Sequence, residues 1–515
     1  MSIFLRYNEH VEKSNLYHIL IWTIFGRMSV MLFGIQNKIQ NVLIKCERTL
    51  RNKCLIYGTV ERRINYCMSD MREKYESLAL NDLKEIAKVR GIRISGLKKA
   101  DLIAAMLEED KKDEEKGKVV EAKSIIPGSS SDKEKFPSEL DSGMKANGIL
   151  EVMPDGYGFI RCENYLPGEN DVYVAPSQIR RFNLKTGDIL EGNTRIKTQA
   201  EKFSALLYVS KINGFPPEIA QRRTNFEDMT PIFPNERLRL ETSGGSMAMR
   251  IMDLICPVGK GQRGMIVSPP KAGKTTLLKE VAKSLKKTSP NVHLIILLID
   301  ERPEEVTDFK EAIEGPNVEV IYSTFDELPE HHKRVAEMVI ERAKRLVEHK
   351  QDVCVLLDSI TRLTRAYNLT VPPSGRTLSG GLDPAALHMP KRFFGAARNM
   401  RGGGSLTILA SALVETGSKM DDVIYEEFKG TGNMEMVLDR KLSEKRVFPA
   451  VDIAKSSTRR EDLLLTPDEQ EIVNILRKAL NGMKADEAVD KILDMFARTK
   501  TNGEFVNMVR KMKFI

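Results

Sequence analysis

Cysteine is scarce in this chain, and its scarcity excludes two common stabilising devices. Six cysteines occur among 515 residues, and no two of them form a CxxC pair. A disulfide framework and a structural zinc site both need clustered cysteines, so we expect neither, and no structural metal. Such sparse cysteine is typical of a protein that stays in the reducing cytoplasm.

Long hydrophobic runs are lacking as well. Two apolar runs near the amino end, LYHILIWTIF and MSVMLFGI, are each shorter than the ~20 residues that cross a bilayer. Joined, they would be long enough, with Arg27 near the centre at a cost of about 2.5–3.5 kcal/mol. No small-residue cleavage site marks a signal peptide. A membrane anchor therefore stays as an alternative for this segment.

Residues 1–70 differ in composition from the rest of the chain. They hold the only tryptophan, three of the six cysteines, and ten Lys or Arg against five Asp or Glu, which is +5 of the formal net charge of +8. From Met71 onward, MREKYESLALNDLKEIAKVRG reads as the start of a soluble helical domain. We interpret residues 1–70 as a dispensable extension, such as one that results from a translation start site assigned too far upstream. The mild positive charge of the whole chain suits nucleic acid, but a solvated surface explains it equally well.

Hydrophobic patterning divides the remaining sequence into five parts. Residues 71–110 carry two apolar stripes at helical spacing, and 111–145 are charged and serine-rich, as in a flexible linker. Residues 146–215 contain five short alternating runs between turn signals, which predict a small five-stranded β-barrel. After a connector, 216–249, strands alternate with helices over 250–515, which predicts an α/β domain with a mostly parallel sheet.

A phosphate-binding loop is indicated by SPPKAGKTT, which runs from Ser268 to Thr276. Gly273, Lys274 and Thr275 match the end of the GxxxxGK[ST] pattern, while Ser268 stands where its first glycine belongs. Small residues leave backbone N–H groups free to face a phosphate. We expect Lys274 to reach the β- and γ-phosphates and Thr275 to offer its hydroxyl to Mg²⁺. The helix that follows directs its positive end at the same anion.

Two further strands end in acids that suit nucleotide hydrolysis. VCVLLD ends at Asp358, whose carboxylate can hold a Mg²⁺-bound water, and HLIILLID is followed by Glu301 and Arg302. The carboxyl ends of parallel strands meet at one edge of a sheet, which is the usual ligand position. Glu301 is therefore expected to orient water on the γ-phosphate. A surface acid cluster is the alternative.

The barrel region carries aromatic residues that suit single-stranded nucleic acid. In DGYGFIR, Tyr157 and Phe159 share one face of a strand with Arg161, and another aromatic residue follows in DVYV. Gly156 and Gly158 are expected to leave that face open, so that each base stacking on the rings contributes ~1–3 kcal/mol. The alternative is that these aromatic residues fill the barrel core.

Assembled in order, these segments resemble the bacterial transcription termination factor Rho family from about Leu78 to the end of the chain, but not over 1–70. The runs that carry the resemblance are PSQIRRFNLKTGD, PVGKGQRGMIVSPPKAGKTT, LIDERPEEVTDF, LLDSITRLTRAYN, LHMPKRFFGAARN, TGSKMDDVIYEEFKGTGNME and EKRVFPA. The resemblance implies a multidomain protein with a small helical N-terminal subdomain, an OB or cold-shock-like barrel and a RecA-like P-loop ATPase domain.

The activity that the resemblance implies is that of an RNA-dependent ATPase and helicase. Members of the family form ring-shaped homohexamers, use ATP and Mg²⁺, bind cytosine-rich nascent RNA and move 5′ to 3′. They dissociate the RNA polymerase elongation complex in the cytoplasm, in some settings with accessory termination factors. Two rivals share part of the pattern: a rotary or secretion ATPase, which would not need the aromatic barrel, and a passive RNA-binding factor with a dead ATPase.

Site residues follow from the resemblance position by position. The primary RNA site comprises Gly156, Tyr157, Gly158, Phe159, Ile160, Arg161, Asp171, Val172, Tyr173, Glu201, Lys202 and Phe203. At the positions of Tyr157 and Phe203 this chain differs from the family pattern by an exchange between Phe and Tyr, which should preserve stacking. The pore loops that grip RNA comprise Arg376, Thr377, Leu378, Ser379, Gly380, Gly381 and Lys419. Arg376 stands where a lysine is familiar, so the charge is kept.

The nucleotide-binding residues implied by the resemblance lie in two glycine-rich segments and at two separate positions. They are Gly259, Lys260, Gly261, Gln262, Arg263, Gly264, Lys271, Ala272, Gly273, Lys274, Thr275, Thr276, Arg302 and Phe448. Phe448 would pack on the adenine, and Glu301 with Lys274 would be catalytic. Arg459 is expected as the arginine finger given to the neighbouring subunit, with Arg446 as a second candidate, since a planar fork of donors stabilises a transferring phosphoryl group.

Overall fold

The computed structural model describes residues 140–198, 201–480, 483 and 485–512, together with Ala87, Lys99, Ala100, Ile103 and Ala104. The chain divides into two compact units, 1–131 and 132–515, of which the second holds nearly all described residues. The expected extension 1–70 and almost all of the helical subdomain and linker lie outside the described residues. Within the described part of the chain, no helix is long and apolar enough to cross a membrane.

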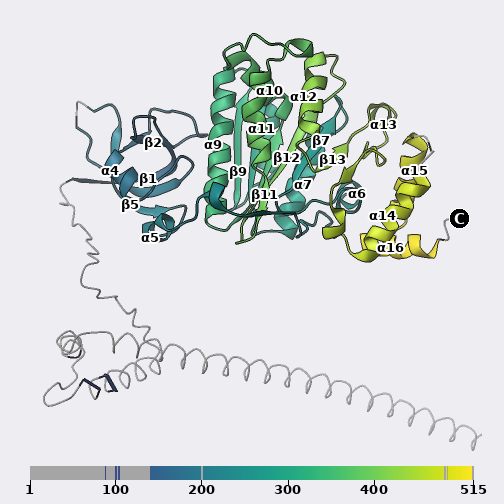
Figure 1. Cartoon of the computed structure of the whole chain (residues 1–515), viewed down its shortest axis with the longest axis horizontal. Coiled ribbons are helices and arrows are strands. Elements are labelled where there is room, and N and C mark those ends of the chain that lie inside the picture. The colour runs from purple at the N-terminus through teal and green to yellow at the C-terminus, as the bar shows by residue number, and fades with distance from the viewer. Residues whose placement is uncertain are drawn as a thin grey trace, which may run out of the picture. The chain divides into compact units, whose positions relative to one another are not determined.

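The first part of the second unit is a closed β-barrel, as the alternating runs predict (Figure 1). Its strands are β1 (Asp141–Val152), β2 (Gly158–Arg161), β3 (Val172–Val174), β4 (Ile189–Arg195) and β5 (Ser204–Ile212). They pair in the order β1-β2-β3-β5-β4, and β4 pairs back with β1. Because β1 begins at Asp141, the barrel starts before the expected boundary at 146.

Alternation along the strands fills the barrel interior, because successive side chains of a strand point to opposite faces. In β4 every second residue is buried. Two short helices, α4 (Pro176–Arg181) and α5 (Pro217–Gln221), begin at prolines, whose fixed φ suits the first turn. The barrel core consists of Ala146, Leu150, Ile160, Val172, Val174, Ile179, Leu184, Leu190, Leu206, Val209, Ile212 and Ala220.

Nearly continuous apolar runs build the second sheet, which belongs to the motor domain. Its strands are β6 (Pro231–Ile232), β7 (Arg263–Ser268), β8 (His293–Glu301), β9 (Val318–Thr324), β10 (Asp352–Asp358), β11 (Arg398–Met400), β12 (Ser405–Leu413), β13 (Met434–Val437) and β14 (Ser457–Thr458). Seven of them follow the order β14-β13-β7-β12-β10-β8-β9. From β13 to β9 all neighbours are parallel, which confirms the predicted α/β class.

Helices cover both faces of this sheet (Figure 1). One face packs against α6 (Met247–Ile255), α7 (Lys274–Thr288) and α8 (Pro303–Ala312). The other packs against α9 (Pro329–Glu348), α10 (Ile360–Thr370), α11 (His388–Gly395) and α12 (Lys419–Lys429). The run HKRVAEMVIERAKRLVEHK thus forms most of α9, a helix because its apolar residues recur at helical spacing.

The carboxyl-terminal part adds helices that the sequence patterns had not delimited. They are α13 (Arg440–Glu444), α14 (Pro467–Leu480), α15 (Ala485–Ala497) and α16 (Asn502–Lys511). Phe496 and Phe505 stack with ring centroids 4.0 Å apart and join α15 to α16. Figure 1 shows α14 to α16 at the end of the second unit opposite the barrel. Short 3₁₀ turns, η1 (Phe226–Asp228), η2 (Ser379–Gly381), η3 (Pro384–Leu387) and η4 (Glu461–Leu463), complete the elements.

The barrel contacts the motor mainly through α9, the motor helix beside it in Figure 1. The guanidinium of Arg223, in the connector, donates to both oxygens of the barrel residue Asp188 at 2.6 and 2.7 Å. The Nε of Arg223 lies 2.9 Å from Oε2 of Glu348, at the end of α9. Both carboxylates are fully buried, so this bridge joins the two domains away from water.

Candidate functional site

The phosphate loop, residues 269–273, connects β7 to α7. Lys271 and Gly273 have φ angles of 64° and 92°, which bring the loop back over the end of the strand. Ser268 is fully buried and its Oγ donates to the carbonyl of Pro269, so a small residue is required where the pattern has glycine. Helix α7 begins at Lys274 and directs its positive end at the loop, as phosphate binding requires.

Four strand ends bring the catalytic candidates together at one edge of the sheet. The Nζ of Lys274 lies 2.9 Å from Oε1 of Glu301 and also contacts Asp358. Ser411, at the end of β12, donates to Asp358 at 2.7 Å. Arg362, at the start of α10, lies 3.5 Å from Oε2 of Glu301. No role was predicted for Ser411 or Arg362: Ser411 belongs to no quoted motif, and Arg362 lies in the run LLDSITRLTRAYN without a function assigned to it.

Burial and the neighbouring charges shift the pKa values of Lys274 and Glu301. Burial, and then the nearby carboxylate of Asp358, raise the pKa of Glu301, while Lys274 and Arg362 oppose that rise. For Lys274, burial favours the neutral amine, but Asp358 and Glu301 outweigh it and raise the pKa of Lys274. The amine therefore stays charged, and Glu301 takes up a proton closer to neutrality than an ordinary glutamate does.

The oxygen donors at this edge fit Mg²⁺. Thr275 lies in the first turn of α7, its hydroxyl 3.3 Å from Oε2 of Glu305, and the carboxylate of Asp358 lies beside Lys274. Hydroxyl and carboxylate oxygens are the hard ligands that Mg²⁺ prefers. Within the described residues no three His, Cys, Asp or Glu side chains form a metal cage.

Phe448 and Arg446 lie at the same edge of the sheet as the phosphate loop. A Cβ placed on Gly273 would lie 3.9 Å from Cε1 of Phe448, so the half-exposed ring reaches the loop. Arg446 follows α13 and is exposed. Arg302, also exposed, lines a cavity of about 310 Å³ with Asp300, Phe325, Arg362, Arg365, Leu413 and Asp421.

Arg459 and the segment Gly259–Gly264 lie at the opposite edge of the sheet. β7 starts at Arg263 in this segment and ends at Ser268, and β13 runs parallel to it with Met434 beside Gly264. Arg459 donates its backbone N–H to the carbonyl of Asn433, at the level of that start. The guanidinium of Arg263 donates to the carbonyls of Thr431 and Ala397. Within one chain, the sheet therefore separates these residues from Lys274.

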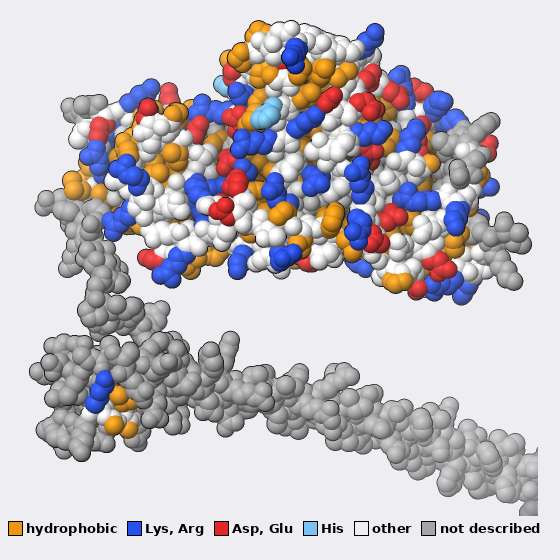
Figure 2. All heavy atoms as spheres, in the orientation of Figure 1, with side chains coloured by type: hydrophobic (Ala, Val, Ile, Leu, Met, Phe, Trp, Pro, Cys, Tyr) orange, Lys and Arg blue, Asp and Glu red, His pale blue; other side chains and the backbone are white. Residues whose placement is uncertain are grey.

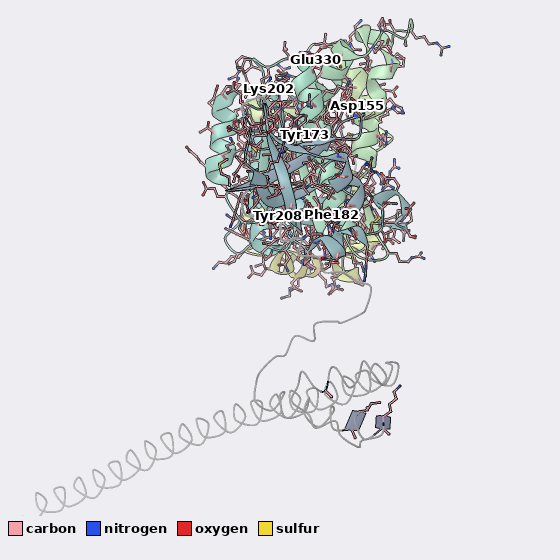
Figure 3. The ribbon with its side chains drawn as sticks, turned by 90° about the vertical axis from the view of Figure 1, so that its left-hand side faces the viewer. Asp155, Tyr173, Phe182, Lys202, Tyr208 and Glu330 are labelled. Carbon is pink, nitrogen blue, oxygen red and sulfur yellow. The ribbon has the colours of Figure 1, made fainter. Side chains whose placement is uncertain are left out.

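The aromatic candidates form one cluster on the outside of the barrel. This aromatic cluster, Tyr157, Phe159, Tyr173 and Phe203, has neighbouring ring centroids 5.1 to 5.9 Å apart. The rings are half-buried and lie outside the barrel core, so the alternative that they fill it is wrong. Viewed from the barrel side, Tyr173 lies between Lys202 and Asp155, away from Phe182 and Tyr208 (Figure 3).

Charged residues surround the aromatic cluster. The guanidinium of Arg161 lies 4.9 Å over the Phe159 ring and contacts Asp171, while Lys202 lies 5.3 Å over Phe203. Glu201 contacts Arg195, a residue that the sequence analysis did not single out. A cavity of about 380 Å³ is lined by Phe159, Tyr173, Ala175, Arg195, Glu201, Lys202, Phe203, Ala205 and Leu206. It offers stacking faces and hydrogen-bonding groups together, as base recognition requires.

Three expected RNA-binding residues face the wrong way for side-chain contact. Ile160 and Val172 belong to the buried core, because they alternate with the outward Phe159 and Tyr173. Only their backbone can meet RNA. A Cβ on Gly158 would lie 2.8 Å from Leu150 inside the barrel. The expectation that Gly158 opens the stacking face is therefore wrong, since the glycine is needed for packing beneath it. Gly156, with φ of 86°, supports a turn.

The two expected pore loops lie against each other. The loop of Arg376 and Thr377 leads through Leu378 into η2, where Gly380 and Gly381 have φ of 80° and 82°. A Cβ on Gly380 would lie 2.5 Å from the backbone nitrogen of Met420, beside Lys419 at the start of α12. Arg376, Ser379 and Lys419 are exposed, so the two adjacent loops present two cations among small residues. Figure 2 shows Lys and Arg elsewhere interspersed with Asp and Glu on the visible face.

Fold and site together define a P-loop ATPase joined to a barrel with an aromatic, base-stacking face. Residues 146–218 match the model of the Rho termination factor RNA-binding domain, and 248–458 match the nucleotide-binding domain of the ATP synthase alpha/beta family. Transcription termination factor Rho of Pseudomonas aeruginosa is 56% identical over 373 residues, 72% of this chain and 88% of the relative. The protein of that name from Aquifex aeolicus is 51% identical over 440 residues, 84% and 94%. That from Bacillus subtilis is 53% identical over 378 residues, 73% and 87%. The chain belongs to the transcription termination factor Rho family.

Proposed function

We propose that this protein hydrolyses ATP to move along RNA 5′ to 3′ and thereby terminates transcription. The observation that carries the proposal is the presence, in one chain, of an aromatic cluster on a barrel and of Lys274 and Glu301 at a phosphate loop. A rotary or secretion ATPase would not need the first feature, and a passive RNA-binding factor would not need the second. Membership in the Rho family supports both together.

In the proposed hydrolytic step, Lys274 turns from Glu301 to the β- and γ-phosphates of ATP when the nucleotide binds. This leaves the Glu301 carboxylate free to accept a proton from water as the water oxygen attacks the γ-phosphorus and the bond to ADP breaks. Thr275 and Asp358 would hold Mg²⁺, which neutralises phosphate charge when bound. Ser411, which donates to Asp358, would keep that carboxylate oriented.

We propose a ring of six subunits, because the arginine that completes hydrolysis lies too far from its own phosphate loop. Arg459 and the loop occupy opposite edges of the sheet, so a head-to-tail neighbour would bring them together. The segment Gly259–Gly264 would then meet the neighbour's nucleotide as well. Arg446 and Phe448, at the loop's own edge, are better suited to hold the nucleotide of their own subunit.

RNA would meet two sites in turn. The aromatic cluster would stack cytosine bases of the nascent transcript, with Arg161, Glu201 and Lys202 reading their edges. The strand would then enter the central channel, where the exposed Arg376 and Lys419 grip its backbone. The proposed target is an RNA polymerase elongation complex, approached with or without accessory factors. Because nascent bacterial transcripts are cytoplasmic, we place the activity in the cytoplasm.

The test measures ATP hydrolysis by the full chain with and without oligocytidine RNA. We expect strong stimulation by the RNA, a loss of at least ~100-fold in rate in Lys274→Ala, and an oligocytidine affinity at least ~5-fold weaker in Phe159→Ala. Phe182→Ala, a ring on the barrel outside the aromatic cluster, serves as control and should bind RNA normally. Hydrolysis indifferent to RNA would favour another RecA-like ATPase, and RNA binding without hydrolysis would leave the passive factor.

A further inference from the structure

Alternating charges run from motor helix α9 to the aromatic cluster on the barrel. One terminal nitrogen of Arg334, on α9, lies 2.8 and 2.7 Å from the two carboxylate oxygens of Glu151, on β1. Oε2 of Glu151 also accepts from Nε of Arg161 at 2.7 Å. Arg161 in turn contacts Asp171 and covers the Phe159 ring. Three successive contacts thus join a motor side chain to a stacking ring.

Burial from water strengthens the ionic contacts in this group. The side chains of Arg161 and Asp171 are 6% and 2% exposed, and that of Glu151 is 16% exposed. The side chain of Arg334 is 36% exposed, so this contact lies at the edge of the group. Because Glu151 is largely screened from water, hydration would replace only part of the interaction lost with Arg334. β1 and β2 pair with Glu151 opposite Phe159, so the two side chains are neighbours on one face of the barrel. A movement of the Glu151 carboxylate therefore changes the surroundings of the Phe159 ring.

We propose that Arg334 is a positioning residue of the primary RNA site, supplied by the motor domain. This rests on the proposed binding of RNA at the aromatic cluster. Arg334 holds both oxygens of Glu151, and Glu151 together with Asp171 holds Arg161 over Phe159 in the orientation that meets a base. The same contact sets the local charge, because Glu151 and Asp171 are balanced by Arg161 and Arg334.

Loss of Arg334 would have two effects, and both would weaken RNA binding. Glu151 would no longer be held from the motor side, so Arg161 would lose its fixed orientation. The four-residue group would also carry a net negative charge, which repels the phosphates of RNA. Neither effect reaches Lys274 or Glu301, so the maximal rate of RNA-stimulated hydrolysis should stay unchanged while more RNA is needed to reach it.

The experiment compares variants of the full chain for oligocytidine affinity, for the RNA concentration that half-stimulates ATP hydrolysis, and for Tm. Arg334→Gln should raise the Kd for oligocytidine and the half-stimulating RNA concentration by about threefold to tenfold, while the maximal rate of hydrolysis stays unchanged. Arg334→Lys keeps a cation that can bridge the two oxygens and should restore affinity in large part. In a Glu151→Gln background, Arg334→Gln should weaken binding less than in the wild type, because the contact with the carboxylate is already lost and only the loss of one positive charge remains.

Tyr165→Phe is the matched control. It removes another contact between barrel and motor, that of the Tyr165 hydroxyl with Glu319, without touching Arg161. We expect normal RNA affinity in this variant. If Tyr165→Phe weakens RNA binding as much as Arg334→Gln, the junction acts as a general tether and the proposal is overturned. Normal RNA constants in Arg334→Gln, while Phe159→Ala loses binding, would overturn it too and leave the RNA site intact. Full binding by Phe159→Ala would instead refute the proposed RNA site itself.

Discussion

At the scale of single residues, the proposed chemistry depends on one carboxylate, and several neighbouring charges affect its pKa. Glu301 is 3% exposed and has Lys274 on one oxygen and Arg362 near the other. Burial and Asp358 raise its pKa, and the two cations limit that rise. A base must be unprotonated to accept a proton from water, so we expect the pKa of Glu301, the proposed base, to set the acidic limit of hydrolysis.

The pH profile tests this arrangement. In the wild type, RNA-stimulated hydrolysis should fall on the acid side with a midpoint above the ordinary glutamate value of about 4.3. Arg362→Gln removes a cation that lowers the pKa of Glu301, so the midpoint should move to higher pH. Arg365→Gln is the control, since Arg365 pairs with Asp421 and not with Glu301. A midpoint shared by wild type and Arg362→Gln would contradict control of Glu301 by Arg362.

At the scale of elements, the barrel packs closely against helix α9 through the turn that contains Gly187. Gly187 has φ of 95°, and a Cβ there would lie 2.5 Å from the backbone carbon of Glu341. A backbone atom of a helix cannot give way as a side chain does. The glycine is therefore required both by its left-handed conformation and by the distance between the two domains.

Gly187→Ala should destabilise the folded chain by about 2 kcal/mol or more, because strain from the positive φ adds to the clash. Gly214→Ala is the matched control: its φ is 81°, but nothing lies within 4 Å of an added Cβ, so only the conformational cost of about 1 kcal/mol remains. Thermal unfolding measures both. Equal losses of Tm would show that the contact with α9 contributes nothing to stability.

At the scale of the whole molecule, the parallel sheet separates the phosphate loop from the arginine that we propose as the finger. Lys274 and Glu301 lie at the carboxyl edge, whereas Arg459 lies beside the start of β7. Because one chain cannot bring these groups together across its own sheet, the proposed role of Arg459 in hydrolysis requires a head-to-tail neighbour.

Mixing two inactive variants tests the shared site. Arg459→Ala and Lys274→Ala should each lower hydrolysis strongly, by ~10³-fold or more for a lost arginine finger. A mixed ring contains interfaces where the intact loop of one variant meets the intact Arg459 of the other, about one interface in four after random assembly. We expect hydrolysis to reappear on mixing. If it does not, while mixed rings form, Arg459 does not act across the interface.

Much of the fold follows from local pattern. The alternating runs of the barrel and the apolar runs ending at Asp300 and Asp358 predicted the strands found there, because burial of one or both faces leaves a direct mark on the sequence. The helices α14 to α16 and the strands β13 and β14 were not delimited. Two- and four-residue strands carry too little periodicity to be recognised.

The sequence by itself determined the parts: a phosphate loop with the candidate residues for hydrolysis, a barrel with aromatic residues on one face of a strand, and membership of one family. Each of these depends on neighbours in the chain, through spacing and alternation. Only the tertiary structure decided that Ser411 orients Asp358, that Gly158 packs inward, and that Arg334 holds Glu151. Arg334 and Glu151 are 183 positions apart, and no periodicity links residues whose contact arises only when two domains pack together.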